Sequence, residues 1–130
     1  NRKTGFSMTS SQVKLLYLED EVIIALDTED MLRSMGVAEI SVAHRLETAE
    51  KLAQRGEFTH ALLDINVGRG CTSFELGRKL AEQGVHVIFA SGYDRSNFSG
   101  QVEGFDYIEK PLDPSSLKRC CPILEDQVSA

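Results

Sequence analysis

The sequence has few of the features that mark secreted, membrane-spanning or nucleic-acid-binding proteins. Its three cysteines are Cys71 and the adjacent pair Cys120 and Cys121, a spacing that fits neither a disulfide framework nor a CxxC metal site. No apolar run is longer than a β-strand, and no signal peptide is visible. The net charge of −6, with basic residues scattered among more numerous acids, argues against nucleic acid as a partner. We therefore expect a soluble, cytoplasmic protein with reduced thiols and no membrane partner.

The length and composition fit one domain. A chain of 130 residues with 42% hydrophobic residues has enough apolar side chains for one ordinary core. We expect residues 1–12 to be a disordered lead-in, some of it added for cloning. Residues 13–124 should form the domain, and residues 125–130 should form a C-terminal tail.

Apolar runs of strand length alternate with segments of helical periodicity. The first helix should end before Gly36, which is placed to close it in a left-handed cap. Thr72 and Glu75 have the spacing of a capping box at the start of the third helix. One face of the first helix should carry Ile24, Thr28, Met31 and Met35, with Leu32 at its margin. The expected strands are residues 13–18, 37–43, 60–66, 85–90 and 105–109. The expected helices are residues 22–35, 46–55 and 73–83, a short or frayed segment within 94–104, and a last helix capped by Asp113.

Strands that alternate with helices predict an α/β domain with a parallel sheet. The first, third and fourth strands are the most apolar and belong in the middle of the sheet, whereas the second and fifth are polar enough to be edges. The strand order 2-1-3-4-5 satisfies this pattern. We predict a flavodoxin-like, doubly wound sheet of five parallel strands with helices on both faces.

Polar side chains follow four of these strands. In a parallel sheet the carboxyl ends of the strands share one edge, and open α/β sheets bind ligands there. Carboxylates that converge at this edge cannot all stay ionised without a counter-charge, because like charges a few ångströms apart raise each other's pKa. The residues at these strand ends are Glu19 and Asp20, Asp64 and Asn66, Ser91, and Lys110.

A hard divalent cation resolves this conflict of charge. Mg²⁺ takes a few carboxylate or carbonyl oxygens and keeps some of its waters, which leaves room for a phosphate oxygen. Asp20 and Asp64 would bind it directly, and the backbone carbonyl of Asn66 would add a third oxygen. Glu19 would act through water.

Asp64 is the candidate nucleophile for a phosphoryl group. The cation, the Lys110 ammonium and the Ser91 hydroxyl are suited to neutralise the phosphoryl oxygens. Each feature alone has an ordinary explanation: an acidic pair often starts a helix, and a Ser-Gly is often only a loop. Their coincidence at four strand ends favours a phosphoryl site.

Four motifs resemble the signature positions of the receiver (CheY-like) domain of two-component response regulators. They are LLYLEDE at residues 15–21, LLDIN at 62–66, ASG at 90–92 and YIEKP at 107–111. The resemblance implies that Asp64 accepts phosphate as an acyl phosphate from a sensor histidine kinase or a histidine phosphotransfer protein. It assigns metal binding to Glu19 and Asp20, phosphate binding to Lys110, and the roles of switch hydroxyl and switch aromatic to Ser91 and Tyr107. It also implies a cis peptide bond between Lys110 and Pro111.

One motif points to a subgroup. FASGY at residues 89–93 is similar to the FATGY motif of alphaproteobacterial single-domain receivers that are tied to stress signalling and to kinases of the HWE type. Ser91 keeps the hydroxyl of the commoner Thr and loses a methyl group. After Asp64 many receivers have Met-Pro where this chain has Val-Gly-Arg-Gly at residues 67–70, and we expect this loop to be more mobile.

Output should pass through another protein. The resemblance further implies that phosphorylation draws the Ser91 hydroxyl toward the new oxygens and lets Tyr107 turn inward, which would change the face built from residues 91–124. That face would bind a downstream protein, or the domain would serve as a phosphate sink or shuttle for its kinase. We expect a self-phosphorylating phosphoacceptor, capable of autodephosphorylation, and not an enzyme with a separate substrate.

Two other classes stay open. The first is a pseudoreceiver, an interaction module that never accepts phosphate. The second is a phosphatase with an aspartate nucleophile. A flavodoxin-like cofactor binder is disfavoured, because acids, and not a glycine-rich phosphate loop, follow the first strand.

Overall fold

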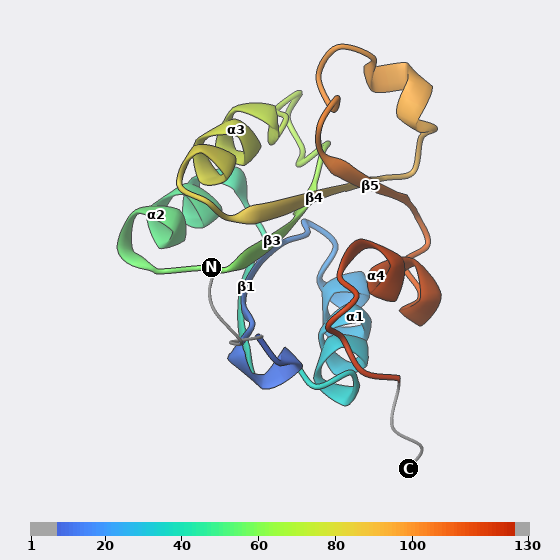
Figure 1. Ribbon diagram of the computed structural model, residues 1–130. Helices are drawn as coiled ribbons and strands as arrows, with labels where there is room; N and C mark the ends of the chain where they lie inside the picture. Colours follow the sequence, from blue (N-terminus) through green and yellow to red (C-terminus); the bar gives the residue numbers. More distant parts are fainter. Residues whose placement is uncertain (1–7, 127–130) are drawn as a thin grey trace.

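The computed structural model describes residues 8–126 (Figure 1). The expected lead-in and tail therefore lie partly outside the described residues. Within them, Ser10–Gln12 form a short 3₁₀ helix, η1. Ser10 is 2% exposed, and its hydroxyl donates to the Glu125 carboxylate at 2.8 Å. The expectation of disorder does not hold for residues 8–12, because a small polar side chain is buried there with a partner that lies far away in the sequence.

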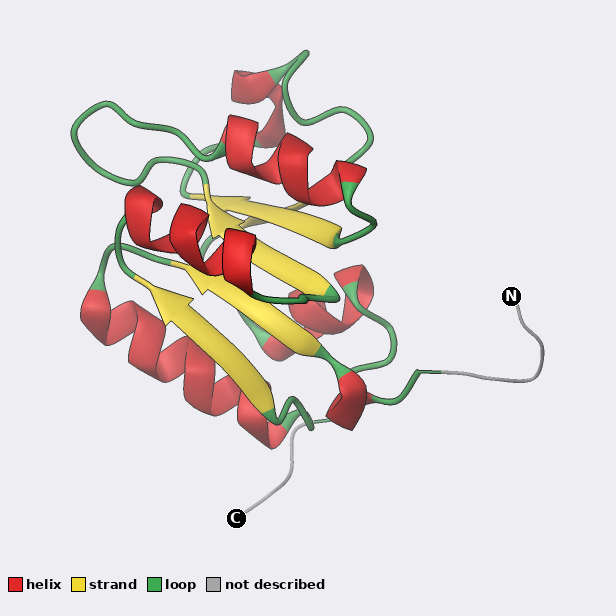
Figure 2. Ribbon diagram, turned by 90° about the vertical axis from the view of Figure 1, so that its left-hand side faces the viewer, coloured by secondary structure: helices red, strands yellow, loops and turns green. Residues whose placement is uncertain are grey.

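The sheet has the predicted strand order. Five parallel strands are arranged β2-β1-β3-β4-β5 (Figure 2). Leu18 pairs with Leu63 and Asp64 pairs with Ala90, so the carboxyl ends of the central strands lie level with one another. The strands are β1 (Lys14–Leu18), β2 (Glu39–Ala43), β3 (His60–Asp64), β4 (His86–Ser91) and β5 (Asp106–Glu109).

Helices cover both faces of the sheet, which gives the predicted doubly wound fold. α1 (Val22–Ser34) and α4 (Pro114–Cys120) lie on one face, and α2 (Leu46–Arg55) and α3 (Phe74–Glu82) lie on the other (Figure 1). The expected weak segment before β5 contains only a 3₁₀ turn, η2 (Arg95–Phe98). Among residues 8–126, no helix has the length and apolar character needed to cross a membrane.

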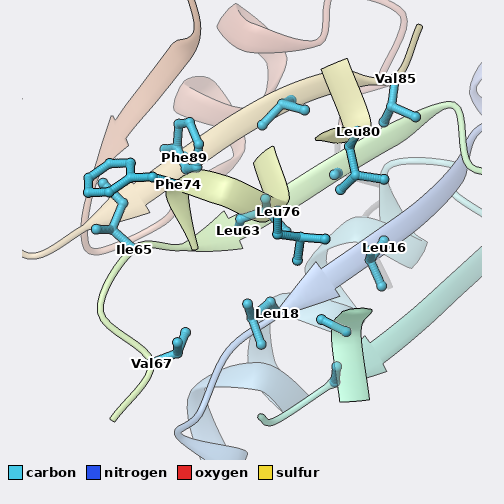
Figure 3. Packing of buried hydrophobic residues seen from close by; sticks show 14 of the residues in the cluster. Leu16, Leu18, Leu63, Ile65, Val67, Phe74, Leu76, Leu80, Val85 and Phe89 are labelled. Carbon is cyan, nitrogen blue, oxygen red and sulfur yellow. The ribbon is translucent and has the colours of Figure 1, made fainter. Parts of the chain in front are cut away.

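The core is divided by the sheet. On the α2/α3 side, side chains of β1, β3 and β4 meet Leu76 and Leu80 of α3 (Figure 3). Phe89 is fully buried there and packs against Gly77, where a Cβ atom would lie 2.3 Å from the Phe89 ring. On the other side, Leu32 of α1 and Leu117 of α4 pack onto the sheet. α3 therefore approaches the sheet closely because position 77 has no side chain.

The buried face of α1 differs from the prediction. Thr28 and Met35 are buried as expected, Met31 is half-buried, and Leu32 lies fully on the face and not only at its margin. Ala25 completes the face, whereas Ile24 is 37% exposed. The expectation for Ile24 is therefore wrong. The small Ala25 side chain faces the sheet, and the larger apolar side chains at the start of the helix point away from it.

The helix ends show one further correction. Gly36 has a φ of 100° after α1, and Asp113 accepts a hydrogen bond from the Ser116 N–H at 2.8 Å at the start of α4, both as predicted. The capping box of Thr72 and Glu75 is wrong, because α3 begins at Phe74 with Ser73 as N-cap and no side-chain cap bond. The Ser73 hydroxyl instead donates a hydrogen bond to the backbone carbonyl of Asp64.

Candidate functional site

Carboxylates from two neighbouring strands meet at the carboxyl edge of the sheet. Glu19 and Asp20 follow β1 and Asp64 ends β3, and one oxygen from each lies within 4.8 Å of the others. Glu19 is 0% exposed and Asp64 is 6% exposed, whereas Asp20 faces solvent. The edge therefore holds a partly buried cluster of acids that is open to solvent on one side.

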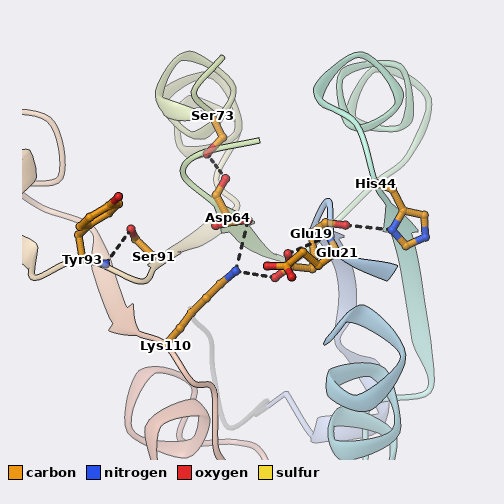
Figure 4. A network of polar contacts seen from close by, with 8 residues as sticks. All are labelled: Glu19, Glu21, His44, Asp64, Ser73, Ser91, Tyr93 and Lys110. Atoms are coloured by element: carbon orange, nitrogen blue, oxygen red, sulfur yellow. Dashed lines mark hydrogen bonds and ion pairs between the residues drawn. The ribbon is translucent and has the colours of Figure 1, made fainter. Parts of the chain in front are cut away.

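Lys110 is the cation that contacts this cluster. Its ammonium Nζ lies 2.7 Å from Glu19 Oε1 and 3.3 Å from Asp64 Oδ2 (Figure 4). Its backbone N–H donates to the Ser91 carbonyl at 2.7 Å, which joins the end of β5 to the end of β4. The peptide bond between Lys110 and Pro111 is cis, as the resemblance implied. One ammonium offsets only one of the three carboxylate charges.

This excess of negative charge perturbs the Asp64 carboxylate. Burial, together with the nearby Glu19 carboxylate, raises the pKa of Asp64 to about 7, although the Lys110 ammonium acts in the opposite direction. Burial alone would lower the pKa of Lys110, but its contacts with Glu19 and Asp64 outweigh burial and raise it. Lys110 therefore stays charged, while Asp64 is partly protonated at neutral pH unless further positive charge arrives.

The residues present fit a hard divalent cation. The cluster offers carboxylate oxygens, one side open to water, and more negative charge than Lys110 can offset. Asn66 lies just beyond β3, where it forms an isolated bridge with Thr72. Metal binding by the Asn66 carbonyl stays a prediction.

Ser91, which follows the strand partner of Asp64 in β4, and Tyr107 contact the same residue. Ser91 ends β4, is 1% exposed, and accepts a hydrogen bond from the Tyr93 N–H at 3.1 Å. Tyr107 of β5 is 8% exposed, and its hydroxyl donates to the Tyr93 carbonyl. Burial raises the pKa of the Tyr107 phenol. The ring that was expected to turn inward on phosphorylation already lies inward in this structure.

Two positioning contacts escaped the sequence analysis. The Ser73 hydroxyl, which is 0% exposed, donates to the backbone carbonyl of Asp64 at 2.7 Å. His44 Nδ1 lies 2.9 Å from the backbone carbonyl of Glu19. His44 could have been found, because it follows β2 and the predicted order puts β2 beside β1. Ser73 gave no signal, since the path of the loop between β3 and α3 decides where it lies.

That loop is a miniature hairpin. The Val67 N–H donates to the Cys71 carbonyl at 3.1 Å, and Gly68, Arg69 and Gly70 have φ values of 85°, 54° and 73°. Glycine tolerates this left-handed region, whereas Arg69 adopts it at a cost. A cavity of about 580 Å³ lies between the hairpin and the start of α2, and Asp20 forms part of its wall. Solvent therefore reaches Asp20 from this side.

An apolar surface begins directly after the acids. Ile23 is 76% exposed, Leu26 57%, Val22 53% and Ile24 37%. We call these four residues of α1 the apolar rim. They lie one to five residues after Glu21, so the rim borders the same edge of the sheet as Asp64.

Comparisons with known proteins identify the fold that carries this site. No protein-family model and no curated protein matches the chain. Solved structures do. A receiver domain protein (CheY-like) from Methanospirillum hungatei is 26% identical, with a TM-score of 0.70 over 82% of this chain and 88% of that chain. Response regulator TrrA from Thermotoga maritima, in complex with Mg²⁺ and beryllium fluoride, is 20% identical, with a TM-score of 0.74 over 87% of this chain and 100% of that chain.

A third similar structure carries the modification itself. It is a response regulator from Burkholderia pseudomallei with a phosphorylated aspartate, a calcium ion and citrate. It is 22% identical to this chain, with a TM-score of 0.74 over 84% of this chain and 66% of that chain. The chain therefore has the fold of the CheY-like receiver domains of response regulators.

Proposed function

We propose that this chain is a phosphoacceptor receiver of two-component signalling in the cytoplasm. Asp64 would accept a phosphoryl group from a phosphohistidine of a sensor histidine kinase or a histidine phosphotransfer protein. One observation carries the proposal: a buried carboxylate at a strand end lies within reach of both a lysine ammonium and two further acids that can hold a cation. A purely structural ion pair would not need the uncompensated acids.

The transfer requires the protein to form only one covalent bond. An Asp64 oxygen forms a bond to phosphorus while the N–P bond of the donor breaks, and the imidazole nitrogen keeps the electron pair. Mg²⁺ bound by Asp20 and Asp64 would supply positive charge to the phosphoryl oxygens and hold Asp64 ionised. Lys110 Nζ already lies 3.3 Å from Asp64 Oδ2 and donates to an oxygen of the arriving group.

Ser91 can contribute a second donor. Its hydroxyl oxygen accepts the Tyr93 N–H, and a hydroxyl that accepts one bond still has its proton to donate. A bond from Ser91 to a phosphoryl oxygen would link the acceptor to the loop that begins at Gly92. The phosphorylation state of Asp64 would then change the position of this loop and of the face built from residues 91–124.

The apolar rim supports a protein, and not a small molecule, as the phosphate donor. Exposed side chains such as Ile23 are costly to keep in water beside a polar site, and a helical partner would cover them while its phosphohistidine reaches Asp64. In this proposal the Ile23→Ser variant slows transfer from a phosphorylated histidine phosphotransfer protein about tenfold. The same variant reacts normally with acetyl phosphate and keeps its melting temperature. Equal slowing with both donors would contradict the role of the rim.

The decisive experiment is phosphorylation with acetyl phosphate and Mg²⁺, read by intact-mass spectrometry. We expect one added phosphoryl group on the natural chain, which hydroxylamine removes as it removes acyl phosphates. The matched control is Asp64→Asn, which should gain no mass. A natural chain that gains none would indicate a pseudoreceiver. Repeated turnover of p-nitrophenyl phosphate that requires Asp64 would indicate a phosphatase.

We further propose that the chain is a receiver of the FATGY-like type, served by a kinase of the HWE type. The FASGY motif at residues 89–93 and the single 3₁₀ turn of η2 support this. Two outputs remain: binding of a downstream protein, and service as a phosphate sink. The lifetime of the phosphorylated chain separates them, because a half-life of many hours with Mg²⁺ present is incompatible with a sink.

A further inference from the structure

One arginine organises the segment between β4 and β5. After η2 the chain reaches β5 through turns in which Gly100 and Gly104 have φ values of 86° and 85°. A regular helix would satisfy the carbonyls of such a segment with its own N–H groups. Here the Arg95 guanidinium Nη2 donates to the carbonyls of Val102 and Phe105, each at 3.0 Å. The Val102 carbonyl also accepts the Phe105 N–H at 3.0 Å, so Arg95 adds a second donor there and joins the start of this segment to its end.

The same guanidinium covers the aromatic ring of Tyr107. The Arg95 Cζ atom lies 6.0 Å from the centre of that ring, within the range of a cation–π contact. Phe98 of η2 lies on the ring as well, with the two ring centres 6.3 Å apart. Tyr107 could turn outward only by leaving both neighbours and giving up its hydrogen bond to the Tyr93 carbonyl.

Tyr93 connects this arrangement to the phosphoryl site. Its N–H donates to the Ser91 hydroxyl, and its carbonyl accepts from Tyr107. Across the described residues, the polar and aromatic contacts of the Tyr107 side chain come from Tyr93, Arg95, Phe98 and the Ser91 hydroxyl, and none comes from the three carboxylates. The inward position is therefore already held by this loop and by Ser91 in a structure with no phosphoryl group on Asp64.

We propose that Arg95 is a positioning residue that holds Tyr107 inward and so fixes the backbone of Tyr93 against the Ser91 hydroxyl, whether or not Asp64 is phosphorylated. The proposal rests on the proposed function only in that Ser91 serves the phosphoryl site. The apparent affinity of a site for its ligand falls in proportion to the fraction of molecules that are in the binding-competent arrangement. A site that is already in this arrangement in most molecules therefore binds with its full affinity. If Arg95 is removed and the ring lies outward in nine molecules of ten, the apparent affinity for a phosphoryl mimic falls about tenfold.

The test follows the ring of Tyr107 by NMR of the chain labelled in its tyrosine rings with ¹³C. The sequence has three tyrosines, so each signal can be assigned with a Tyr→Phe variant. In the natural chain we expect the Tyr107 signal to keep its position when Mg²⁺ and beryllium fluoride are added. In Arg95→Ala it should move toward the position of an exposed tyrosine, and beryllium fluoride should bind about tenfold more weakly.

The matched control is Arg119→Ala. Arg119 of α4 lies 3.4 Å from the backbone carbonyl of Tyr107 but makes no contact with the ring, so this variant should leave both readouts unchanged. Arg95→Lys keeps a charge near the ring but cannot serve both carbonyls, so it should restore part of the ring signal. If Arg95→Ala is too unstable to study, Arg95→Gln removes the charge and is read in the same way.

Two results would overturn the proposal. One is a Tyr107 signal that does not change when Arg95 is replaced. The other is a natural chain whose Tyr107 signal moves when beryllium fluoride binds. Failure of the natural chain to bind beryllium fluoride at all would instead refute the phosphoacceptor function, and the ring signals of the natural and Arg95→Ala chains would still decide the role of Arg95.

Discussion

Among single residues, Asp64 has surroundings that disfavour its own charge. Its pKa is raised to about 7 from the ordinary value of 3.8. At a pH between these two values, Asp64 is protonated in the native protein and ionised in the unfolded chain. The stability of the metal-free protein should therefore fall as the pH rises from about 4 to about 7. Charge that Mg²⁺ brings to the cluster should remove this loss.

The Asp64→Asn variant tests this directly. With a metal chelator at pH 8, we expect Asp64→Asn to be more stable than the natural chain by about 1–3 kcal/mol, because a repelled charge is gone. At pH 4 the two chains should unfold at similar urea concentrations, and with Mg²⁺ the advantage should shrink or reverse. Lys110→Met serves as the opposite control and should destabilise the metal-free protein. An advantage of Asp64→Asn that does not depend on pH would contradict the argument.

His60 predicts a second pH dependence, at the other end of the same strand. It is 8% exposed, and burial, helped by the nearby His86, lowers its pKa from 6.5 to about 4. Below pH 6.5 the unfolded chain takes up a proton that the native protein refuses, so stability is lost as the pH falls toward 4. The full loss is about 3 kcal/mol.

Replacement of His60 removes this dependence. His60→Gln should flatten the difference in unfolding free energy between pH 6.5 and pH 4, whatever its effect at neutral pH. His44→Gln is the control, because His44 is exposed and lies at the opposite edge of the sheet. Parallel pH profiles for the natural chain and His60→Gln would show that His60 is not the titrating group.

At the scale of elements, the contact between α3 and β4 reverses the usual effect of a helix glycine. Replacing glycine with alanine inside a helix normally stabilises it by up to about 1 kcal/mol. At Gly77 the new Cβ atom would lie 2.3 Å from the fully buried ring of Phe89. We therefore expect Gly77→Ala to destabilise the protein by about 1–3 kcal/mol in urea unfolding.

A second substitution should recover part of that loss. Phe89→Leu makes room at the same place, so the double variant Gly77→Ala/Phe89→Leu should be more stable than the sum of the two single effects predicts. Additive effects would mean that α3 moves away from the sheet and that the contact is not a tight one.

The positions of the strands could be predicted from how apolar each strand is. The buried face of α1 and the start of α3 could not, because they depend on individual side-chain contacts. The three most apolar strands are the central ones, as expected. The prediction for the face of α1 is wrong at Ile24, which is apolar yet 37% exposed, because apolar periodicity cannot tell a core face from an exposed rim. Thr72 has the chemistry of a helix cap, but the buried carbonyl of Asp64 draws the loop inward and makes Ser73 the N-cap.

The residues of the site show the same division. The sequence predicted Glu19, Asp20, Asp64 and Lys110 at one edge because strand ends are readable and a parallel sheet collects them. It could not predict the inward Tyr107, because that position depends on a guanidinium twelve residues earlier in the chain. A side chain that bonds to the backbone carbonyls of a loop leaves no periodic pattern in the sequence.

For the whole molecule, cation binding should appear as added stability. A ligand that binds only the folded chain stabilises it by about 2.7 kcal/mol at one hundred times its dissociation constant. We expect Mg²⁺ to raise the melting temperature of the natural chain by several degrees at pH 8. Asp20→Asn should remove most of this rise, because it takes one carboxylate from the cluster. An equal rise in Asp20→Asn and the natural chain would place the cation elsewhere.

Ser10, Gly36 and Glu125 meet at the edge of the sheet opposite Asp64. The Glu125 N–H donates to the Met35 carbonyl at 3.0 Å, and the Ser10 hydroxyl donates to the Glu125 carboxylate at 2.8 Å. The two ends of the described chain are thus near neighbours, far from the phosphoryl chemistry. A circular permutant that joins residues 8 and 126 through a short linker, and that opens at the turn of Gly84, would keep every strand in its place. Sensor proteins could then be inserted at new termini while the acidic edge stays intact.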